Sequence, residues 1–256
     1  AEDALKKRLV IYGENRGTSN TITLFSPFAF SKIIKQIEQE EGLFDPSSHP
    51  SLIIKKAAKQ ATIGEISYEL LVNNGLAQIA TSAAIGGFGP LVYQVVMYLN
   101  PDLWLASDYS LKPASEKIWQ KMYEFSNQGM YERKFLGEFN EGVRKLLIRA
   151  RIDRFMLLNG YFKKVLNNEI LPTEEVFLNW LKENNLNPSD FGYLWAYKKS
   201  QHDPKIEELF KGGERFIQQA EDVFNMRKED LKNIITGSGS RLFHALYGSE
   251  ASYTRE

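Results

Sequence analysis

The densest group of chemically active side chains lies between residues 133 and 164, which contain nine basic and three acidic residues. This net charge of +6 is unusual here because the 256-residue chain has 32 basic and 32 acidic residues and is neutral. Lys and Arg in such a cluster can neutralise phosphates, and aromatic rings beside them can stack on bases. The residue types indicate a nucleic-acid interface with the candidate contacts Arg144, Lys145, Arg149, Arg151 and Arg154 and the candidate stacking residues Tyr161 and Phe162.

A second basic patch is formed by Lys55, Lys56 and Lys59. Two interpretations of the basic segment 133–164 stay open. In the first, it follows the phosphates of an RNA strand. In the second, it is an ordinary amphipathic helix whose charges pair with the mildly acidic remainder of the chain.

The composition limits the catalytic chemistry of the chain. It contains no Cys and only three His, which are His49, His202 and His244 and lie far apart. This excludes a disulfide scaffold, a Cys-ligated zinc site and a Cys nucleophile. We expect no metal ion, no cofactor and no catalytic residues, and we predict that the protein is not an enzyme.

Two glycine-rich segments are candidates for holding a phosphate. Gly86-Gly87-Phe88-Gly89 lacks the spacing of a dinucleotide-binding loop, and no strand is predicted before it, so we interpret it as a turn between two helices. Gly237-Ser238-Gly239-Ser240-Arg241 precedes a predicted helix whose N-terminus can bind a phosphate, and the alternative is a flexible turn.

Beyond Pro27 the hydrophobic pattern predicts helices almost throughout. Ser26 and Pro27 supply a cap and a first-turn proline for a helix that ends near Gly42, with Phe28 on its apolar face. The charge-free stretch Leu70–Pro101 predicts two buried helices and no membrane span, because a Gly/Pro turn interrupts it. Further helices are expected after Ser51 and at about residues 63–84, 89–99, 113–128, 133–168, 173–185, 188–200, 203–225, 227–236 and 239–247, with Gly212 and Gly213 as a possible interruption.

Before Pro27, two short β-type runs predict either a hairpin or an extended arm. The expected fold class is therefore mainly α, with a helical body in one or two lobes, a short β-type or extended N-terminal arm and a C-terminal arm. The expected divisions are an N-terminal arm over residues 1–27, an N-terminal helical lobe over 28–101, a connector over 102–113, a C-terminal helical lobe over 114–247 and a tail over 248–256.

One local stretch resembles the phlebovirus-like nucleoproteins of segmented negative-strand RNA viruses. It consists of Glu41-Gly42-Leu43-Phe44-Asp45-Pro46 followed by Ser51-Leu52-Ile53-Ile54-Lys55-Lys56, with an insertion between the halves, and covers about fifteen residues. The layout of arm, helical body and arm is similar as well. The resemblance implies RNA held in a groove between lobes and arms that dock on neighbouring subunits, although such proteins are usually basic and this chain is neutral.

Together these expectations form one hypothesis: an RNA-binding, self-assembling structural protein of nucleocapsid type. It would coat single-stranded RNA in the cytoplasm, associate with itself through its terminal arms and insert into no membrane. The first alternative is a helical interaction or assembly subunit without nucleic acid, which would use exposed aromatic residues at Trp104, Trp119, Tyr193, Trp195 and Tyr197. The second alternative is an α-helical enzyme of unknown reaction.

Overall fold

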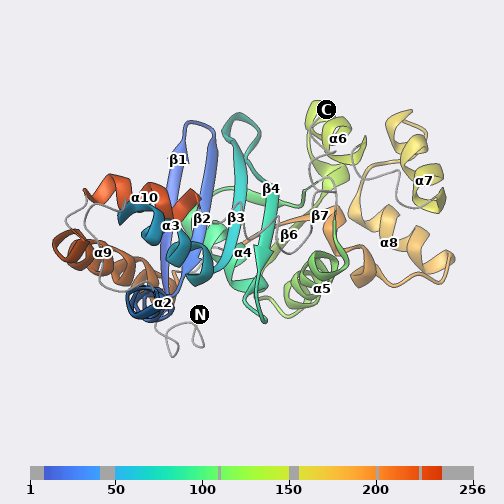
Figure 1. The fold of residues 1–256 in the computed structure, drawn as a ribbon. Coiled ribbons are helices and arrows are strands. Elements are labelled where there is room, and N and C mark those ends of the chain that lie inside the picture. Colours follow the sequence, from blue (N-terminus) through green and yellow to red (C-terminus); the bar gives the residue numbers. More distant parts are fainter. Residues whose placement is uncertain are drawn as a thin grey trace. The chain divides into compact units, whose positions relative to one another are not determined.

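The computed structural model describes residues 9–40, 50–108, 111–149, 156–199, 202–224 and 227–237 (Figure 1). Its strands are β1 (Val10–Arg16), β2 (Ser19–Phe25), β3 (Thr62–Leu71), β4 (Leu76–Ala84), β5 (Trp104–Ala106), β6 (Glu132–Phe135) and β7 (Trp195–Lys198). Its α-helices are α2 (Pro27–Glu40), α3 (Pro50–Ala61), α4 (Gly89–Leu99), α5 (Pro113–Asn127), α6 (Glu141–Arg149), α7 (Met156–Leu166), α8 (Glu174–Glu183), α9 (Pro204–Phe224) and α10 (Lys228–Gly237). Short 3-10 helices are η1 (Val72–Asn74), η2 (Leu136–Glu138) and η4 (Pro188–Leu194).

The strands form one seven-stranded sheet in the order β1-β2-β3-β4-β5-β7-β6. The pairs β1/β2, β2/β3, β5/β7 and β6/β7 are antiparallel, whereas β4 and β5 are parallel and are connected by α4. The expectation of a mainly α fold is therefore wrong, and the fold is a mixture of helices and a mixed sheet. Of the two interpretations of the N-terminal segment, the hairpin is confirmed, and this hairpin is part of the sheet.

The largest error concerns residues 62–84, which were expected to be helical and instead form β3 and β4. β4 is apolar over most of its length, and a short apolar run has no clear period that separates strand from helix. In β3, by contrast, Glu65, Ser67 and Glu69 alternate with apolar residues, which is the period of a strand. The deciding signal is local. Gly75 has a φ of +67° directly after η1, and this left-handed residue turns the chain back into β4.

The expected long helix over residues 133–168 is also wrong. The chain forms β6, η2 and α6 before the segment 150–155, which lies outside the described residues, and resumes as α7. Asn140 sets the start of α6, because its Oδ1 accepts a hydrogen bond of 3.1 Å from the Val143 N–H. The expected helix at 188–200 is η4 followed by β7.

The chain consists of two compact units, and each unit is built from segments that are separate in the sequence. The first unit contains residues 1–69, 81–98 and 202–256, and its main core is aliphatic with a few aromatic rings. The helices α2, α3, α9 and α10 lie over β1 and β2 in this unit (Figure 1). Its largest buried side chains in this core include Phe25 and Phe30, whose ring centroids are 5.5 Å apart.

Helix α9 is continuous through Gly212 and Gly213, so the expected interruption is absent from this described helix. The glycines serve a different purpose, because a Cβ at Gly213 would lie 2.5 Å from the Ile11 carbonyl oxygen. The Tyr12 hydroxyl donates a hydrogen bond of 2.9 Å to the Gly213 carbonyl. The pair of glycines therefore lets α9 approach the backbone of β1 directly.

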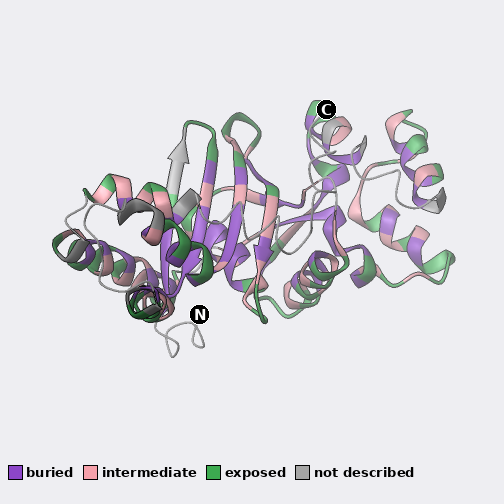
Figure 2. Cartoon of the chain, viewed as in Figure 1, coloured by how far each residue is buried: buried purple, intermediate pink, exposed green. Residues whose placement is uncertain are grey.

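The second unit contains residues 70–80 and 99–201, and its core is strongly aromatic. Phe135 on β6 stacks on Phe177 of α8 with ring centroids 4.8 Å apart, and Trp195 of β7 lies 5.3 Å from Phe135. The purple, buried segments in Figure 2 include β7, of which Trp195, Ala196 and Tyr197 are fully buried. This core holds the elements of the predicted basic segment in place.

Candidate functional site

The turn from β4 into α4 contains Gly86-Gly87-Phe88-Gly89. Gly86 and Gly87 have φ values of +52° and +85°, a left-handed backbone that favours glycine. The expectation that this turn joins two helices is wrong, because a strand of nine residues precedes it. A glycine-rich turn between a strand and a helix N-terminus is the setting in which such turns bind phosphate groups.

Hydrogen bonding in this turn leaves a set of backbone donors free. The Ile85 N–H donates to the Ile63 carbonyl at 2.8 Å, and the Phe88 N–H donates to the Ile85 carbonyl at 3.2 Å. The N–H groups of Gly86, Gly87 and Gly89 have no hydrogen-bond acceptor in the part of the chain that the structure describes. Consecutive free N–H groups at such a turn form an anion-binding concavity.

Space and charge around the turn also suit an anion. A Cβ added at Gly86 or at Gly87 would meet no atom within 4 Å, so a ligand can approach the backbone at both residues. The stretch Leu70–Pro101 carries no charged side chain. Attraction for an anion therefore comes from the backbone donors and from the positive end of the α4 dipole.

Packing beneath the turn fixes it on the first unit. A Cβ at Gly64 of β3 would lie 3.2 Å from the Val92 side chain of α4, so the absence of a side chain at this position allows α4 to pack closely. The hydroxyls of Ser82 and Tyr93 lie 2.6 Å apart and join β4 to α4. These contacts hold the strand end and the helix start in a defined geometry.

The predicted RNA contacts of the basic segment have varied surroundings. Arg144 is half-buried and donates to the Gly137 carbonyl at 3.4 Å, and Lys145 forms an ion pair with Glu141 one turn earlier in α6. Lys163 and Lys164 are exposed at the end of α7. The side chain of Arg149, and Arg151 and Arg154 entirely, lie outside the described residues.

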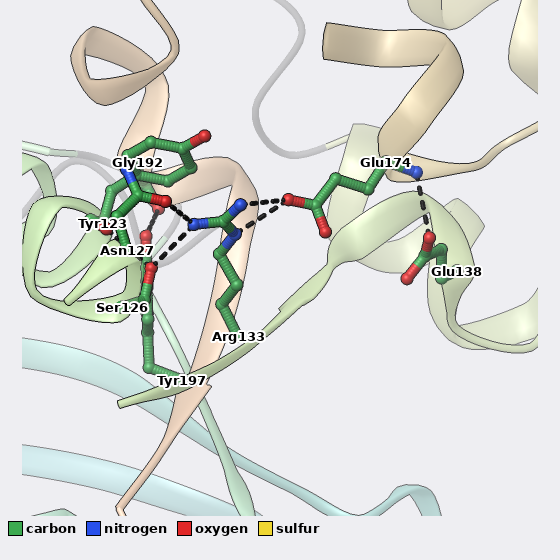
Figure 3. A network of polar contacts seen from close by, with 8 residues as sticks. All are labelled: Tyr123, Ser126, Asn127, Arg133, Glu138, Glu174, Gly192 and Tyr197. Carbon is green, nitrogen blue, oxygen red and sulfur yellow. Dashed lines mark hydrogen bonds and ion pairs between the residues drawn. The ribbon is translucent and has the colours of Figure 1, made fainter. Parts of the chain in front are cut away.

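Arg133, the first residue of this segment, is held by several partners at once (Figure 3). Its Nε and Nη2 both lie 2.7 Å from Glu174 Oε1, and its Nη1 donates to Ser126 Oγ at 3.0 Å and to Asn127 Oδ1. The guanidinium also lies 4.4 Å from the ring centre of Tyr123. All three of its nitrogens are used in contacts within the protein, so Arg133 is a structural residue that joins α5, β6 and α8.

Neighbouring groups extend this network. Glu138 Oε1 accepts a hydrogen bond of 2.9 Å from the Glu174 N–H near the start of α8, where a carboxylate suits the helix dipole (Figure 3). The Tyr197 hydroxyl donates to the Gly192 carbonyl at 2.6 Å, and burial raises the pKa of Tyr197 well above its usual value. Arg133 thus pairs with Glu174 outside the basic segment, but from a strand and not from the expected amphipathic helix. Lys145 pairs with Glu141, which belongs to the same segment.

The predicted stacking residues are buried. Tyr161 and Phe162 are 2% and 1% exposed and pack against Phe177 with ring centroids 5.1 Å and 5.8 Å away. Burial raises the pKa of Tyr161. Neither ring offers a free face, so the prediction that they stack on bases is wrong for this structure, because the aromatic core of the second unit takes up both rings.

The aromatic residues assigned to a partner-binding surface are mostly buried as well. Trp119, Tyr193, Trp195 and Tyr197 are each at most 2% exposed, and Trp104 is half-buried with the Lys198 ammonium 4.6 Å from its ring centre. Their mutual packing explains the error, because aromatic residues dominate the core of this unit.

The second basic patch does lie on the surface. Lys55, Lys56 and Lys59 are exposed on α3, opposite Ile54, Ala57 and Ala58, which are fully buried. Lys32 and Lys35 are likewise exposed on α2. None of these five lysines has an ion-pair partner among the described residues. We call the five lysines the lysine surface.

Glu65 of β3 is a buried acid that the sequence analysis did not single out. It is 6% exposed and stands opposite Thr23 of β2, whose hydroxyl is fully buried and has no hydrogen-bond partner among the described residues. Burial raises the pKa of Glu65 to about 7. No pattern in the sequence marks this residue, because its burial depends on strand pairing.

Comparison with protein-family models, with curated proteins and with solved structures finds no match.

Within the described residues, no helix is both long and apolar enough to cross a membrane. Across the same residues, no group of three or more His, Asp or Glu side chains is arranged to hold a metal ion. The candidate loop at 237–241 lies outside the described residues beyond Gly237. The resemblance to viral nucleoproteins stays a prediction.

Proposed function

We propose that the turn between β4 and α4 binds the phosphate groups of a small molecule such as a nucleotide or a nucleotide-derived cofactor. The observation that carries this proposal is the set of three free N–H groups, on Gly86, Gly87 and Gly89, at a strand-to-helix turn with open space above it. Backbone N–H groups at such turns bind the phosphates of dinucleotides and nucleotides in many α/β proteins.

The position of the turn in the chain supports the same proposal. β4 pairs in parallel with β5 through Leu76–Gln78 and Trp104–Ala106, and α4 is the connection between them. In sheets with parallel strands, ligands bind beyond the carboxyl ends of the strands, and the glycine turn follows the carboxyl end of β4. Because the donors are uncharged, binding should depend weakly on salt concentration.

Isothermal titration and thermal shift with ATP, NADPH and coenzyme A test this proposal, with adenosine as the phosphate-free control. We expect at least one diphosphate-bearing ligand to bind and to raise the melting temperature, whereas adenosine has no effect. Gly87→Asp should abolish binding by repulsion of the phosphate, and Gly87→Asn is the matched neutral control, since Asp and Asn both tolerate a left-handed backbone. Equal binding by the wild-type protein and by Gly87→Asp would contradict the proposal.

RNA binding is the second candidate function, and the lysine surface supports it. Exposed lysines that have no acidic partner among the described residues can neutralise phosphates. The segment 133–164 supports it less, because Arg133 and Lys145 are paired within the second unit. We therefore assign RNA contact first to Lys55, Lys56 and Lys59, with Arg149 and Arg151 as a separate variant to be tested.

Fluorescence anisotropy with a labelled single-stranded 20-nucleotide RNA tests this second candidate. Lys55→Glu/Lys56→Glu/Lys59→Glu should lower the affinity at least tenfold, and the affinity of the wild-type protein should fall steeply between about 50 and 200 mM salt. The control Lys117→Glu/Lys121→Glu reverses two exposed lysines at the same four-residue spacing on α5. Equal losses in the two variants would indicate a general charge effect and would remove the lysine surface from the site.

A further inference from the structure

Helix α2 presents an exposed aromatic ring beside two lysines. Phe28 is 71% exposed, and Lys32 and Lys35 follow it four and seven residues later, which places all three on one side of the helix. The opposite side packs into the core through Phe30, Ile34 and Ile37. Phe28 was expected on the apolar face, and that expectation is wrong, because Phe28 and Phe30 point to different sides of the helix.

A backbone hydrogen bond joins the start of α2 to the end of α3. The Ser26 N–H donates to the Ala61 carbonyl at 2.9 Å. Phe28 lies two residues after Ser26, and Lys59 lies two residues before Ala61. Ser26 Oγ also accepts a hydrogen bond from the Ala29 N–H at 3.1 Å, so the first turn of α2 is capped. The first turn of α2, which carries Phe28, therefore lies beside the last turn of α3, which carries Lys59.

We infer that Phe28 is a base-stacking platform and that the lysine surface therefore selects single-stranded over double-stranded nucleic acid; the inference rests on the proposed RNA binding. Every base has an aromatic face, and stacking on a protein ring is tolerant of sequence. In a duplex the bases are already stacked and the ring cannot reach them, so a duplex can use only the lysines. Charge complementarity commits the surface to a polyanion, since none of its five exposed lysines has an ion-pair partner among the described residues.

The test compares a labelled 12-nucleotide single-stranded RNA with a 12-base-pair duplex RNA in anisotropy titrations of the full chain. Phe28→Ala should weaken single-strand binding about tenfold and leave duplex binding unchanged. Phe28→Trp should restore single-strand binding. Leu171→Ala is the matched control, because Leu171 is 68% exposed and lies in the second unit. Circular dichroism verifies that each variant is folded, as an exposed ring contributes little to stability.

The outcomes separate this inference from the proposal beneath it. If the wild-type protein binds neither RNA, both the RNA function and the stacking role are overturned. If RNA binds in a lysine-dependent manner but Phe28→Ala changes nothing, or weakens both RNAs equally, only the stacking role is overturned. Sedimentation with phosphatidylserine vesicles is the last arm, and a Phe28-dependent preference for vesicles over RNA would replace the inference with a membrane surface.

Discussion

The Arg133 network and the glycine turn differ in whether their hydrogen-bond donors have acceptors within the protein. In the network, three nitrogens of one guanidinium contact Glu174, Ser126 and Asn127, so a basic residue is fully used within the protein. In the turn, a stretch without any charged side chain leaves the N–H groups of Gly86, Gly87 and Gly89 without acceptors among the described residues. The number of positive charges in a segment therefore does not show which polar groups are left without a partner.

The comparison also explains why charge counting pointed to residues 133–164. A count registers basic residues but not their partners, and the partners of Arg133 lie 7 residues before it and 41 residues after it. Backbone donors do not enter such a count at all. The following predictions test whether the network is structural and whether the turn is available for a ligand.

The largest effect is expected from Arg133→Ala. The variant leaves Glu174 without its cation and removes the contact with Tyr123, which should lower the free energy of unfolding by about 3–4 kcal/mol. Urea denaturation followed by circular dichroism measures this change. Arg133→Lys keeps the charge but loses the planar guanidinium. Its free energy of unfolding should therefore lie between those of the wild-type protein and Arg133→Ala. A loss below about 0.5 kcal/mol for Arg133→Ala would show that the network is not structural.

Glu65→Gln should change how stability depends on pH. Burial raises the pKa of Glu65 to about 7 from a usual value of 4.5, so the folded state holds the proton more tightly than the unfolded state. The contribution of Glu65 to stability is then greatest below about pH 4.5 and falls by about 2–3 kcal/mol as the pH rises to about 7. Glu65→Gln lacks this fall, so urea curves of the two proteins should agree at pH 4.5 and diverge at pH 8. Parallel pH profiles would contradict the prediction.

Gly87→Ala should lower stability by about 1 kcal/mol, because alanine is strained at a φ of +85°. The matched control is Gly160→Ala in α7, where the added methyl group meets no atom within 4 Å and helix propensity should raise stability by about 0.5–1 kcal/mol. Thermal unfolding of both variants gives opposite shifts if this is correct. A shift of the same sign would show that the turn does not require a left-handed backbone.

Lys145→Ala should have the smallest effect. Its ion pair with Glu141 is exposed and spans one helical turn, and such pairs contribute about 0.3–0.5 kcal/mol. Urea denaturation at low and high salt measures the difference, which should shrink as salt is added. A loss as large as that of Arg133→Ala would remove the distinction between a surface pair and a structural one.

Helices with clear signals could be predicted from the sequence, whereas only the β1/β2 hairpin of the sheet was among the expectations. The start of α2 at Pro27 and the capped start of α8 follow from Ser26-Pro27 and Thr173, both confirmed as capping positions. β4 was not predicted because its small and apolar residues show no clear alternation. β3 does alternate between polar and apolar residues from Glu65 to Leu70, and the helical interpretation overlooked this strand signal. The glycine turn is interpreted from the sequence as a connection between two helices, because a phosphate-binding turn requires a preceding strand and none is predicted there. The helical period does distinguish Phe28 from the buried Phe30, because residues two positions apart lie on nearly opposite sides of a helix.

The uneven distribution of aromatic residues makes the two units spectroscopically distinct. All four tryptophans, Trp104, Trp119, Trp180 and Trp195, belong to the second unit, and Trp195 lies 4.8 Å from Tyr123 in the core. Emission excited at 295 nm therefore comes from that unit alone, while the first unit, with the glycine turn and the lysine surface, is dark at this wavelength. A single tryptophan introduced beside the turn would report ligand arrival against that separate background.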